Sequence, residues 1–280
     1  ASSVIYGNFA KVRNHGVDLS IDYGKQISKD FTLQFKGTFT FARNKVLEYD
    51  EAPGLRPGMK TVGRRLNTFL GYVTNGLYEN YTDVEESPTS TLGNIAISPG
   101  DIKYVDQPDA NGNYDGRITS DDRVEIGDPW IPEIVYGFGP SMRWKNWDFS
   151  FFFQGQTNVS LIMENFEPFG ERSARGVLAW IADDYWSPDY PNVNAKHPRL
   201  TRLTNNHNMQ VSTYWLRDAS FLKLKNVELG YSYKKARFYI SGSNLLTISP
   251  FKHWDPEVGT GAGMQYPTQR IFNLGIQMSF

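Results

Sequence analysis

The amino-acid sequence predicts an all-β fold: about seven antiparallel strands that form the last part of a large transmembrane β-barrel with long extracellular loops. Three observations predict it. Apolar and polar residues alternate along several segments, short and long connections alternate between those segments, and aromatic residues gather beside the short connections. The composition agrees, because the 280 residues include 18 Phe, 7 Trp and 16 Tyr, together with 25 Gly and 15 Pro.

The strands are predicted from period-two alternation, which places successive side chains on opposite faces of a sheet. The clearest segment is 31–41, where one face carries Phe31, Leu33, Phe35, Gly37, Phe39 and Phe41. The intervening residues are Thr, Gln and Lys. Six further segments follow the same rule: 17–24, 135–144, 147–154, 227–233, 237–241 and 271–280.

The connections between these strands fall into two groups. Residues 25–30, 145–146 and 234–235 form short links, and the segments at about 43–133, 157–220 and 248–269 are long. The two kinds alternate strictly, so every short link lies on the same side of the sheet. Outer-membrane barrels have short periplasmic turns and long extracellular loops. The three long segments are therefore predicted to be extracellular.

Aromatic residues at the ends of the predicted strands support a membrane location. Those beside the short links are Tyr23, Phe31, Trp144, Trp147, Tyr231, Tyr233, Phe238 and Phe280. An interfacial aromatic girdle has this placement, whereas a soluble core would have its rings mid-strand as often. Seven strands do not close a barrel of even strand number, so the chain is expected to supply only part of one.

Composition excludes several other classes of protein. The 29 Lys and Arg nearly balance 30 Asp and Glu, so no electrostatic case exists for a nucleic-acid partner. The absence of cysteine removes disulfides, thiolate metal sites and thiol catalysis. No apolar run is long enough for a membrane-spanning helix. We expect the chain not to be an enzyme and to require no cofactor.

Seven sequence blocks together resemble the C-terminal part of the SusC/RagA family of TonB-dependent outer-membrane transporters. They are GYVTNGLY at 71–78, PGDIKYVD at 99–106, NGNYDGRI at 111–118, YWSPD at 185–189, WLRDASFLKLKNV at 215–227, GSNLL at 242–246 and DPE at 255–257. The resemblance spans nearly the whole chain, and the block at 215–227 is its most specific part.

The resemblance implies a barrel of about 22 strands with an N-terminal plug, located in the bacterial outer membrane. It also implies partnership with a SusD-like surface lipoprotein, import of glycans or peptides, and contact with TonB through the missing N-terminal part. The terminal Phe280 would be the barrel-assembly signal. We expect residues 1–280 to form the C-terminal barrel segment, with the plug domain absent and the lipid bilayer as the surrounding partner.

The loop 111–122 has the oxygen spacing of a calcium-binding loop. Its expected ligands are the side chains of Asn111, Asn113, Asp115 and Asp122 and the carbonyl of Arg117, with Gly116 at the sharp turn. Because position 1 is Asn and position 12 is Asp rather than Glu, calcium affinity is expected only in the range of roughly 10⁻⁴ to 10⁻³ M. The alternative is a turn whose Asn and Asp side chains bond their own backbone.

Aromatic residues in the long segments are candidates for contact with a ligand or a lid protein, because flat rings with polar edges suit both. The candidates are Trp180, Tyr185, Trp186, Tyr190 and Trp254. Packing of the loops against each other is the alternative explanation for these rings.

Two rival functions are compatible with parts of this pattern. A soluble β-sandwich that binds calcium and carbohydrate would show the same alternation, with its apolar faces buried between two sheets. A secreted glycoside hydrolase would need two carboxylates on rigid facing strands. The acidic pair Asp183 and Asp184 lies in a loop, which favours a solvated turn.

Overall fold

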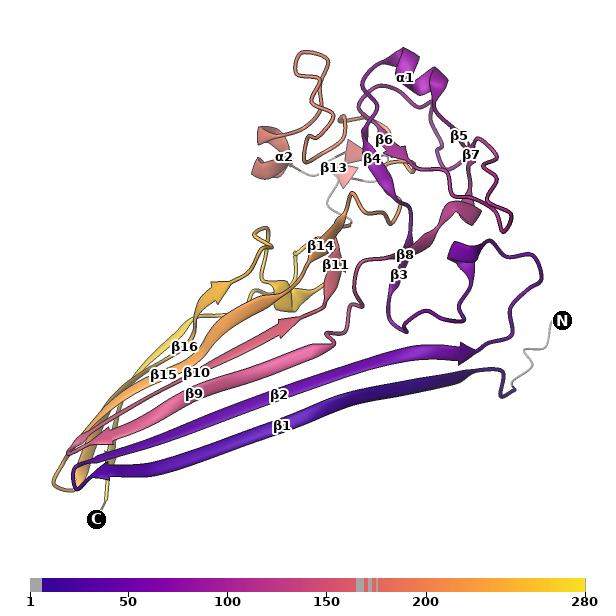
Figure 1. Cartoon of the computed structure of the whole chain (residues 1–280). Coiled ribbons are helices and arrows are strands. Elements are labelled where there is room, and N and C mark those ends of the chain that lie inside the picture. The colour runs from indigo at the N-terminus through magenta and orange to yellow at the C-terminus, as the bar shows by residue number, and fades with distance from the viewer. Residues whose placement is uncertain (1–6, 165–168, 171–172, 175, 280) are drawn as a thin grey trace.

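Seven long strands form one antiparallel sheet in the computed structural model, which describes residues 7–164, 169–170, 173–174 and 176–279. The strands are β1 (Lys11–Ser28), β2 (Phe31–Glu48), β9 (Ile134–Trp144), β10 (Trp147–Thr157), β15 (Phe221–Tyr233), β16 (Ala236–Ile248) and β17 (Ile271–Met278). Their spatial order is the same as their order in the chain, so each strand pairs with its sequence neighbours (Figure 1). This confirms the predicted number and direction of the strands.

Three two-residue turns lie together at one end of the sheet, and the three long connections lie at the other (Figure 1). The turns are 29–30, 145–146 and 234–235. Lys145 and Lys234 have φ values of 53° and 52°, which suits tight hairpin turns between twisted strands. The first turn is shorter than the predicted 25–30, because backbone pairing of β1 with β2 continues to Ser28 after the side-chain alternation ends.

The strand register builds one apolar row and one polar row across β2, β9, β10, β15, β16 and β17. Successive cross-strand partners in the apolar row are Leu33, Met142, Phe149, Leu229, Ile240 and Leu274. The adjacent polar row consists of Gln34, Ser141, Ser150, Glu228, Ser241 and Asn273. Because neighbouring residues on a strand point to opposite faces, the sheet has an apolar face and a polar face.

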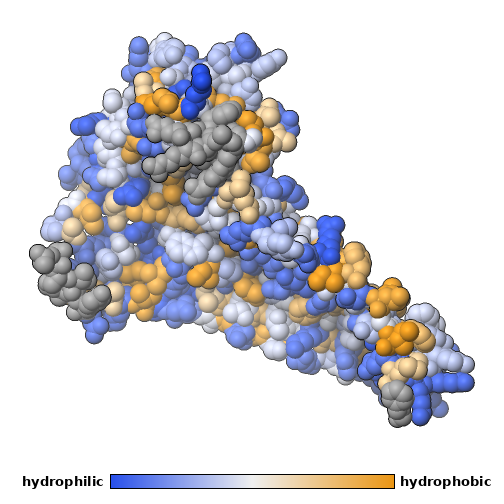
Figure 2. Space-filling model, turned by 180° about the vertical axis from the view of Figure 1, so that it is seen from behind, coloured by the Kyte–Doolittle hydropathy of each residue, from blue (hydrophilic) through white to orange (hydrophobic). Residues whose placement is uncertain are grey.

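No second sheet covers this apolar face in the part of the chain that the structure describes. Leu274 is 82% exposed, Ile276 is 64% exposed and Ile240 is 54% exposed. Hydrophobic side chains are visible on the surface along the sheet as far as its turn end (Figure 2). A sandwich would bury these residues between two sheets, so the structure does not favour the soluble-module alternative.

The three long connections, residues 49–133, 158–220 and 249–270, pack into a separate body that we call the loop domain. Its short elements are η1 (Pro57–Met59), β3 (Phe69–Gly71), β4 (Thr74–Leu77), α1 (Tyr81–Glu86), β5 (Thr89–Ser90), β6 (Ile102–Tyr104), β7 (Arg117–Ile118), η2 (Ser120–Asp122), β8 (Val124–Ile126), β11 (Ser160–Ile162), β12 (Phe169–Gly170), β13 (Ser173–Ala174), α2 (Ala179–Asp183), β14 (Leu216–Asp218) and η3 (Pro256–Val258).

The buried hydrophobic core lies in the loop domain and draws on all three connections. Tyr104, Leu161 and Phe251 come from different connections and belong to the same cluster. Among the described residues, no helix is long and apolar enough to cross a membrane. The molecule therefore combines a single-layer sheet with a packed loop domain, which lies at the end of the sheet opposite the short turns.

Candidate functional site

A continuous row of aromatic residues crosses five neighbouring strands beside the short turns. Its members, paired one to the next, are Phe31, Trp144, Trp147, Tyr231 and Phe238. The rings of Trp147 and Tyr231 have centroids 4.7 Å apart. A row of amphipathic rings at one level of an exposed apolar face has the form of an interfacial girdle.

The other predicted girdle residues lie elsewhere. Tyr23 pairs with Phe35 rather than with the row, since β1 extends five residues beyond Tyr23. Tyr233 is 54% exposed next to the turn at 234–235. Phe280 lies outside the described residues, so its predicted role in barrel assembly stays a prediction.

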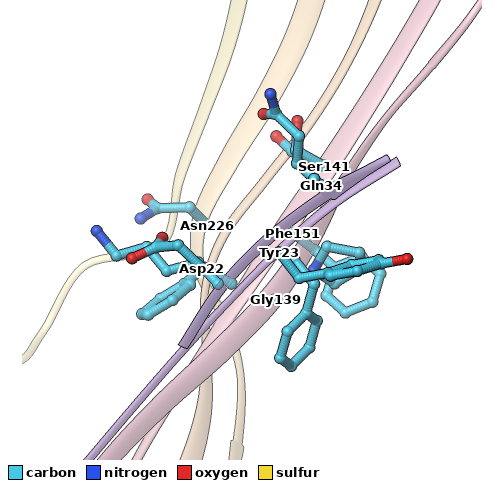
Figure 3. A pocket seen from close by; sticks show the side chains of 13 residues that line it. Asp22, Tyr23, Gln34, Gly139, Ser141, Phe151 and Asn226 are labelled. Carbon is cyan, nitrogen blue, oxygen red and sulfur yellow. The ribbon is translucent and has the colours of Figure 1, made fainter. Parts of the chain in front are cut away.

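The polar face of the sheet carries a groove of about 520 Å³ near the middle of the strands. Asp22, Gln34, Ser141 and Asn226 line it, and Figure 3 shows the side chains of Gln34 and Ser141 on the opposite side of the sheet from the ring of Tyr23. Closer to the turns, Arg237 bonds Asp148 and also Glu228, the latter at 2.6 Å. A face lined by amides, hydroxyls and paired charges suits contact with water.

The loop predicted to bind calcium is organised around Arg56. The guanidinium Nη2 contacts Asp115 Oδ2 at 2.5 Å, and Nη1 contacts Asp122 Oδ1 at 2.7 Å. A third carboxylate, Asp106, is 7% exposed and has its Oδ1 3.8 Å from Nη1. The Asp106 Oδ2 accepts a 2.8 Å hydrogen bond from the backbone N–H of Gly116. We call Asp106, Asp115 and Asp122 the acidic cluster.

The other predicted calcium ligands do not join this cluster. The backbone N–H groups of Asn111 and Asn113 donate to the Asp109 carboxylate at 2.7 and 2.9 Å. The N–H of Arg117 donates to Asp115 Oδ1 at 2.9 Å. These are the bonds expected of a self-bonded turn. The described residues contain no group of three or more acidic or histidine side chains arranged to hold a metal ion, and calcium binding stays a prediction.

Electrostatics show that the acidic cluster carries more negative charge than Arg56 offsets. Burial, together with the charges of Asp122 and Asp115, raises the pKa of Asp106 despite its bond from Gly116. Burial opposes the charge of Arg56, but Asp122 and Asp115 outweigh it and raise the Arg56 pKa. The calcium-loop pattern starts at Asn111, so it did not include Asp106. Arg56 lies far from this loop in the sequence, and only the fold brings it to the three carboxylates.

The aromatic candidates for ligand contact divide by exposure. Trp186 is only 7% exposed and belongs to the core, and Trp180 and Trp254 are partly buried against it. Tyr190 is 79% exposed and Tyr185 is 36% exposed. The two tyrosines therefore present the larger free surfaces, and contact of any of the five with a ligand or lid stays a prediction.

Lys223 joins the sheet to the loop domain and was not recognised from the sequence pattern. Its side chain is fully buried, and its ammonium contacts Asp255 Oδ1 and Glu257 Oε2, each at 2.5 Å. Lys223 lies in the block at 215–227, and both acids lie in the block at 255–257. Two of the blocks that carry the family resemblance thus meet in one ion-pair network.

Curated relatives match almost the whole chain. The TonB-dependent receptor P3 of Formosa agariphila is 27% identical over 308 residues, covering 98% of this chain and 29% of that protein. The TonB-dependent receptor SusC of Bacteroides thetaiotaomicron is 26% identical over 293 residues, covering 98% of this chain and 27% of that protein. The chain thus spans about three tenths of the length of these relatives. No family model matches the chain.

Solved structures show the same fold. A structure of the RagAB peptide transporter matches with a TM-score of 0.71 at 24% identity, covering 98% of this chain and 30% of that chain. The RagAB peptide importer in its open-open state matches with a TM-score of 0.70 at 22% identity, covering 97% and 29%. The relatives are TonB-dependent receptors, which are not enzymes. The chain is thus a homologue of part of the TonB-dependent receptors, SusC among them, and it has the fold seen in the RagAB structures.

Proposed function

We propose that the chain forms barrel wall and extracellular loops of a SusC-like transporter that imports glycans or peptides across the outer membrane. The observation that carries this proposal is the pair of rows across the sheet, one polar and one apolar, with Leu229, Ile240 and Leu274 of the apolar row exposed. In a barrel wall the apolar row meets lipid and the polar row meets the lumen.

The two edges of the sheet support a larger barrel. Strands β1 and β17 each pair with one neighbour, so each has one unpaired edge among the described residues. Unpaired backbone N–H and C=O groups cost several kcal/mol each in hydrocarbon. Further strands of the same transporter are therefore proposed to pair with both edges and close the wall.

The proposed partners follow from where the loop domain lies. All three long connections are at one end of the sheet, opposite the turns, which suits a lid on the extracellular side. The partner proposed there is a SusD-like lipoprotein. The TonB contact is proposed to come from another part of the transporter, at the turn end.

Co-purification and uptake test this function. An affinity tag inserted in the turn at 29–30 would isolate the receptor from outer membranes in detergent, and the expected result is a surface lipoprotein in stoichiometric amount. Cells that carry the receptor should take up labelled oligosaccharide or peptide only while TonB is present. Recovery of the chain in the soluble periplasmic fraction would contradict the proposal.

A further inference from the structure

A pocket in the loop domain combines a half-buried cation with aromatic rings. It has a volume of about 410 Å³ and lies where β14, α2 and the connection after β16 meet. The residues that matter for its chemistry are Trp180, Asp183, Lys196, Arg217, Asp218 and His253. The pocket is separate from the groove on the polar face and from the acidic cluster.

Arg217 is held rigidly without a carboxylate partner. Its Nη1 donates to the backbone oxygens of Tyr214 and Leu216 at 2.7 and 2.8 Å. Among the described residues no carboxylate lies within ion-pair distance of its guanidinium, and burial lowers the pKa of Arg217. The guanidinium is half-buried and has no carboxylate partner among the described residues, so an anion supplied from outside can take that place.

The remaining donors of Arg217 have the geometry for such an anion. A guanidinium offers five N–H groups in a fixed fork. Because Nη1 is used by the backbone, Nε and Nη2 remain, and neither donates to another described residue. This pair of donors can bind the two oxygens of one carboxylate.

Two cations act on the imidazole that lines the pocket. Burial, followed by the charges of Arg217 and Lys196, lowers the pKa of His253. Lys196 has a 3.6 Å contact with Asp184 and stays largely exposed, which leaves most of its charge available. An anion bound at Arg217 would therefore lie near a second cation, Lys196, and the imidazole of His253.

The aromatic rings and the carboxylates at the rim of the pocket restrict which anionic ligands fit it. The rings of Trp180 and His253 have centroids 4.7 Å apart and form an aromatic wall. Asp183 and Asp218 also line the pocket. Carboxylates accept hydrogen bonds from hydroxyls and repel further negative charge, so the best-fitting ligand has one carboxylate, a flat ring face and several hydroxyls.

We propose that this pocket binds a uronic-acid unit of a glycan, with the sugar carboxylate on Arg217, the ring against Trp180 and His253, and hydroxyls toward Asp183 and Asp218. The proposal deepens the transport function, since it assigns acidic glycans as the cargo class. An acidic peptide fits less well, because it brings several carboxylates to the rim and has no pyranose face for the aromatic wall.

Calorimetric titration of the detergent-purified receptor tests the site. The probes are digalacturonate, its methyl ester and the neutral galactose disaccharide, with triglutamate as the peptide probe. Digalacturonate should bind at least ten-fold more tightly than the other three. Arg217→Gln should abolish that preference, and Arg217→Lys should retain part of it, because an ammonium keeps the charge but loses the two-oxygen fork.

Arg202→Gln is the matched control, since Arg202 is an exposed arginine that does not line the pocket. It should leave binding unchanged, and equal thermal unfolding of all variants would show that each is folded. Equal affinity for ester and acid, equal or tighter binding of triglutamate, or full digalacturonate affinity in Arg217→Gln would overturn the proposal. Lipoprotein co-purification and TonB-dependent uptake are measured separately, so transport can hold even where this assignment fails.

Discussion

Single charged side chains fix how the loop domain sits on the sheet. The Lys223 ammonium is enclosed and satisfied by two carboxylates that come from the connection after β16. Breaking a buried pair by removing one partner leaves the other charge uncompensated, which costs more than the pair itself contributes. Lys225 contacts the same Glu257 at 2.7 Å but is 21% exposed, so it offers a matched comparison.

Lys223→Met is expected to destabilise the loop domain by about 3 kcal/mol or more, whereas Lys225→Met should cost about 1 kcal/mol or less. Burial alone would raise the pKa values of Asp255 and Glu257, but Lys223 outweighs it and lowers both. The two ionised carboxylates therefore stabilise the fold fully at pH values above their ordinary pKa values of 3.8 and 4.5. This stabilisation is lost as the pH falls through their lowered pKa values.

Urea unfolding followed by tryptophan fluorescence, at neutral and at acidic pH, measures this effect. The decrease in unfolding free energy between neutral and acidic pH should be smaller in Lys223→Met, because the lysine charge that the two carboxylates pair with is gone. An equal cost for the two lysine variants would show that the buried network does not hold the domains together.

Arg56 has a comparable role in the acidic cluster, where its guanidinium lies near three carboxylates. Arg56→Ala should lower the unfolding temperature, because three carboxylates then face one another without a counter-charge. Millimolar calcium should restore it, since a hard cation takes oxygen ligands at that affinity in extracellular modules. Calcium should raise the unfolding temperature of the wild-type protein only slightly.

Differential scanning calorimetry with and without calcium measures the shift. Arg56→Ala combined with Asp106→Asn removes one ligand and should lose most of the calcium effect. A calcium shift in wild type as large as that in Arg56→Ala would mean that Arg56 does not compete with the ion.

At the scale of strands, alternation in the sequence carried most of the information about the sheet. Strand number, direction and the apolar rows follow from residues such as Phe35, Phe149 and Leu274, because each strand shows one face to each environment. Strand ends were less predictable. Residues 42–48 lose the alternation yet continue β2, since the backbone ladder with β1 does not depend on side-chain identity.

The loop domain was not predictable in the same way. Its strands have only two to four residues, too few for a period to show. Its contacts join distant segments, as when the Tyr104 hydroxyl donates to the His207 carbonyl at 2.6 Å or Arg199 pairs with Asp101 at 2.7 Å. The same reason explains why Arg56 and Arg217 were missed: each acts on residues or ring systems that the fold alone brings to it.

A charge placed on one face of β16 tests the assignment of the two faces. Ile240→Arg puts an arginine on the apolar row and should cost about 2–4 kcal/mol in lipid, the range measured near the bilayer midplane. Ser241→Arg places the same residue on the polar row and should cost far less. Folding in lipid vesicles, followed by heat-dependent gel mobility, gives the comparison, and equal costs would argue against lipid on the apolar face.

The whole molecule combines a single-layer sheet, a loop domain at one end of it and two edges that are unpaired among the described residues. The sheet contributes few buried residues, and the core lies almost entirely in the loop domain. Such a molecule keeps its apolar face stable only where lipid covers it, and its edges only where other strands pair with them. The exposed fractions of Leu274 and Ile276 are those expected of side chains that face lipid.

Site-directed spin labelling tests this setting most directly, because the chain has no cysteine of its own and each introduced cysteine reports alone. Labels placed singly at 33–40 in β2 would be probed with oxygen, which concentrates in lipid, and with a water-soluble nickel complex. The account predicts that odd positions collide with oxygen and even positions with nickel, in a strict period of two. Uniform nickel access at both sets of positions, or protection of the odd positions from both reagents, would contradict it.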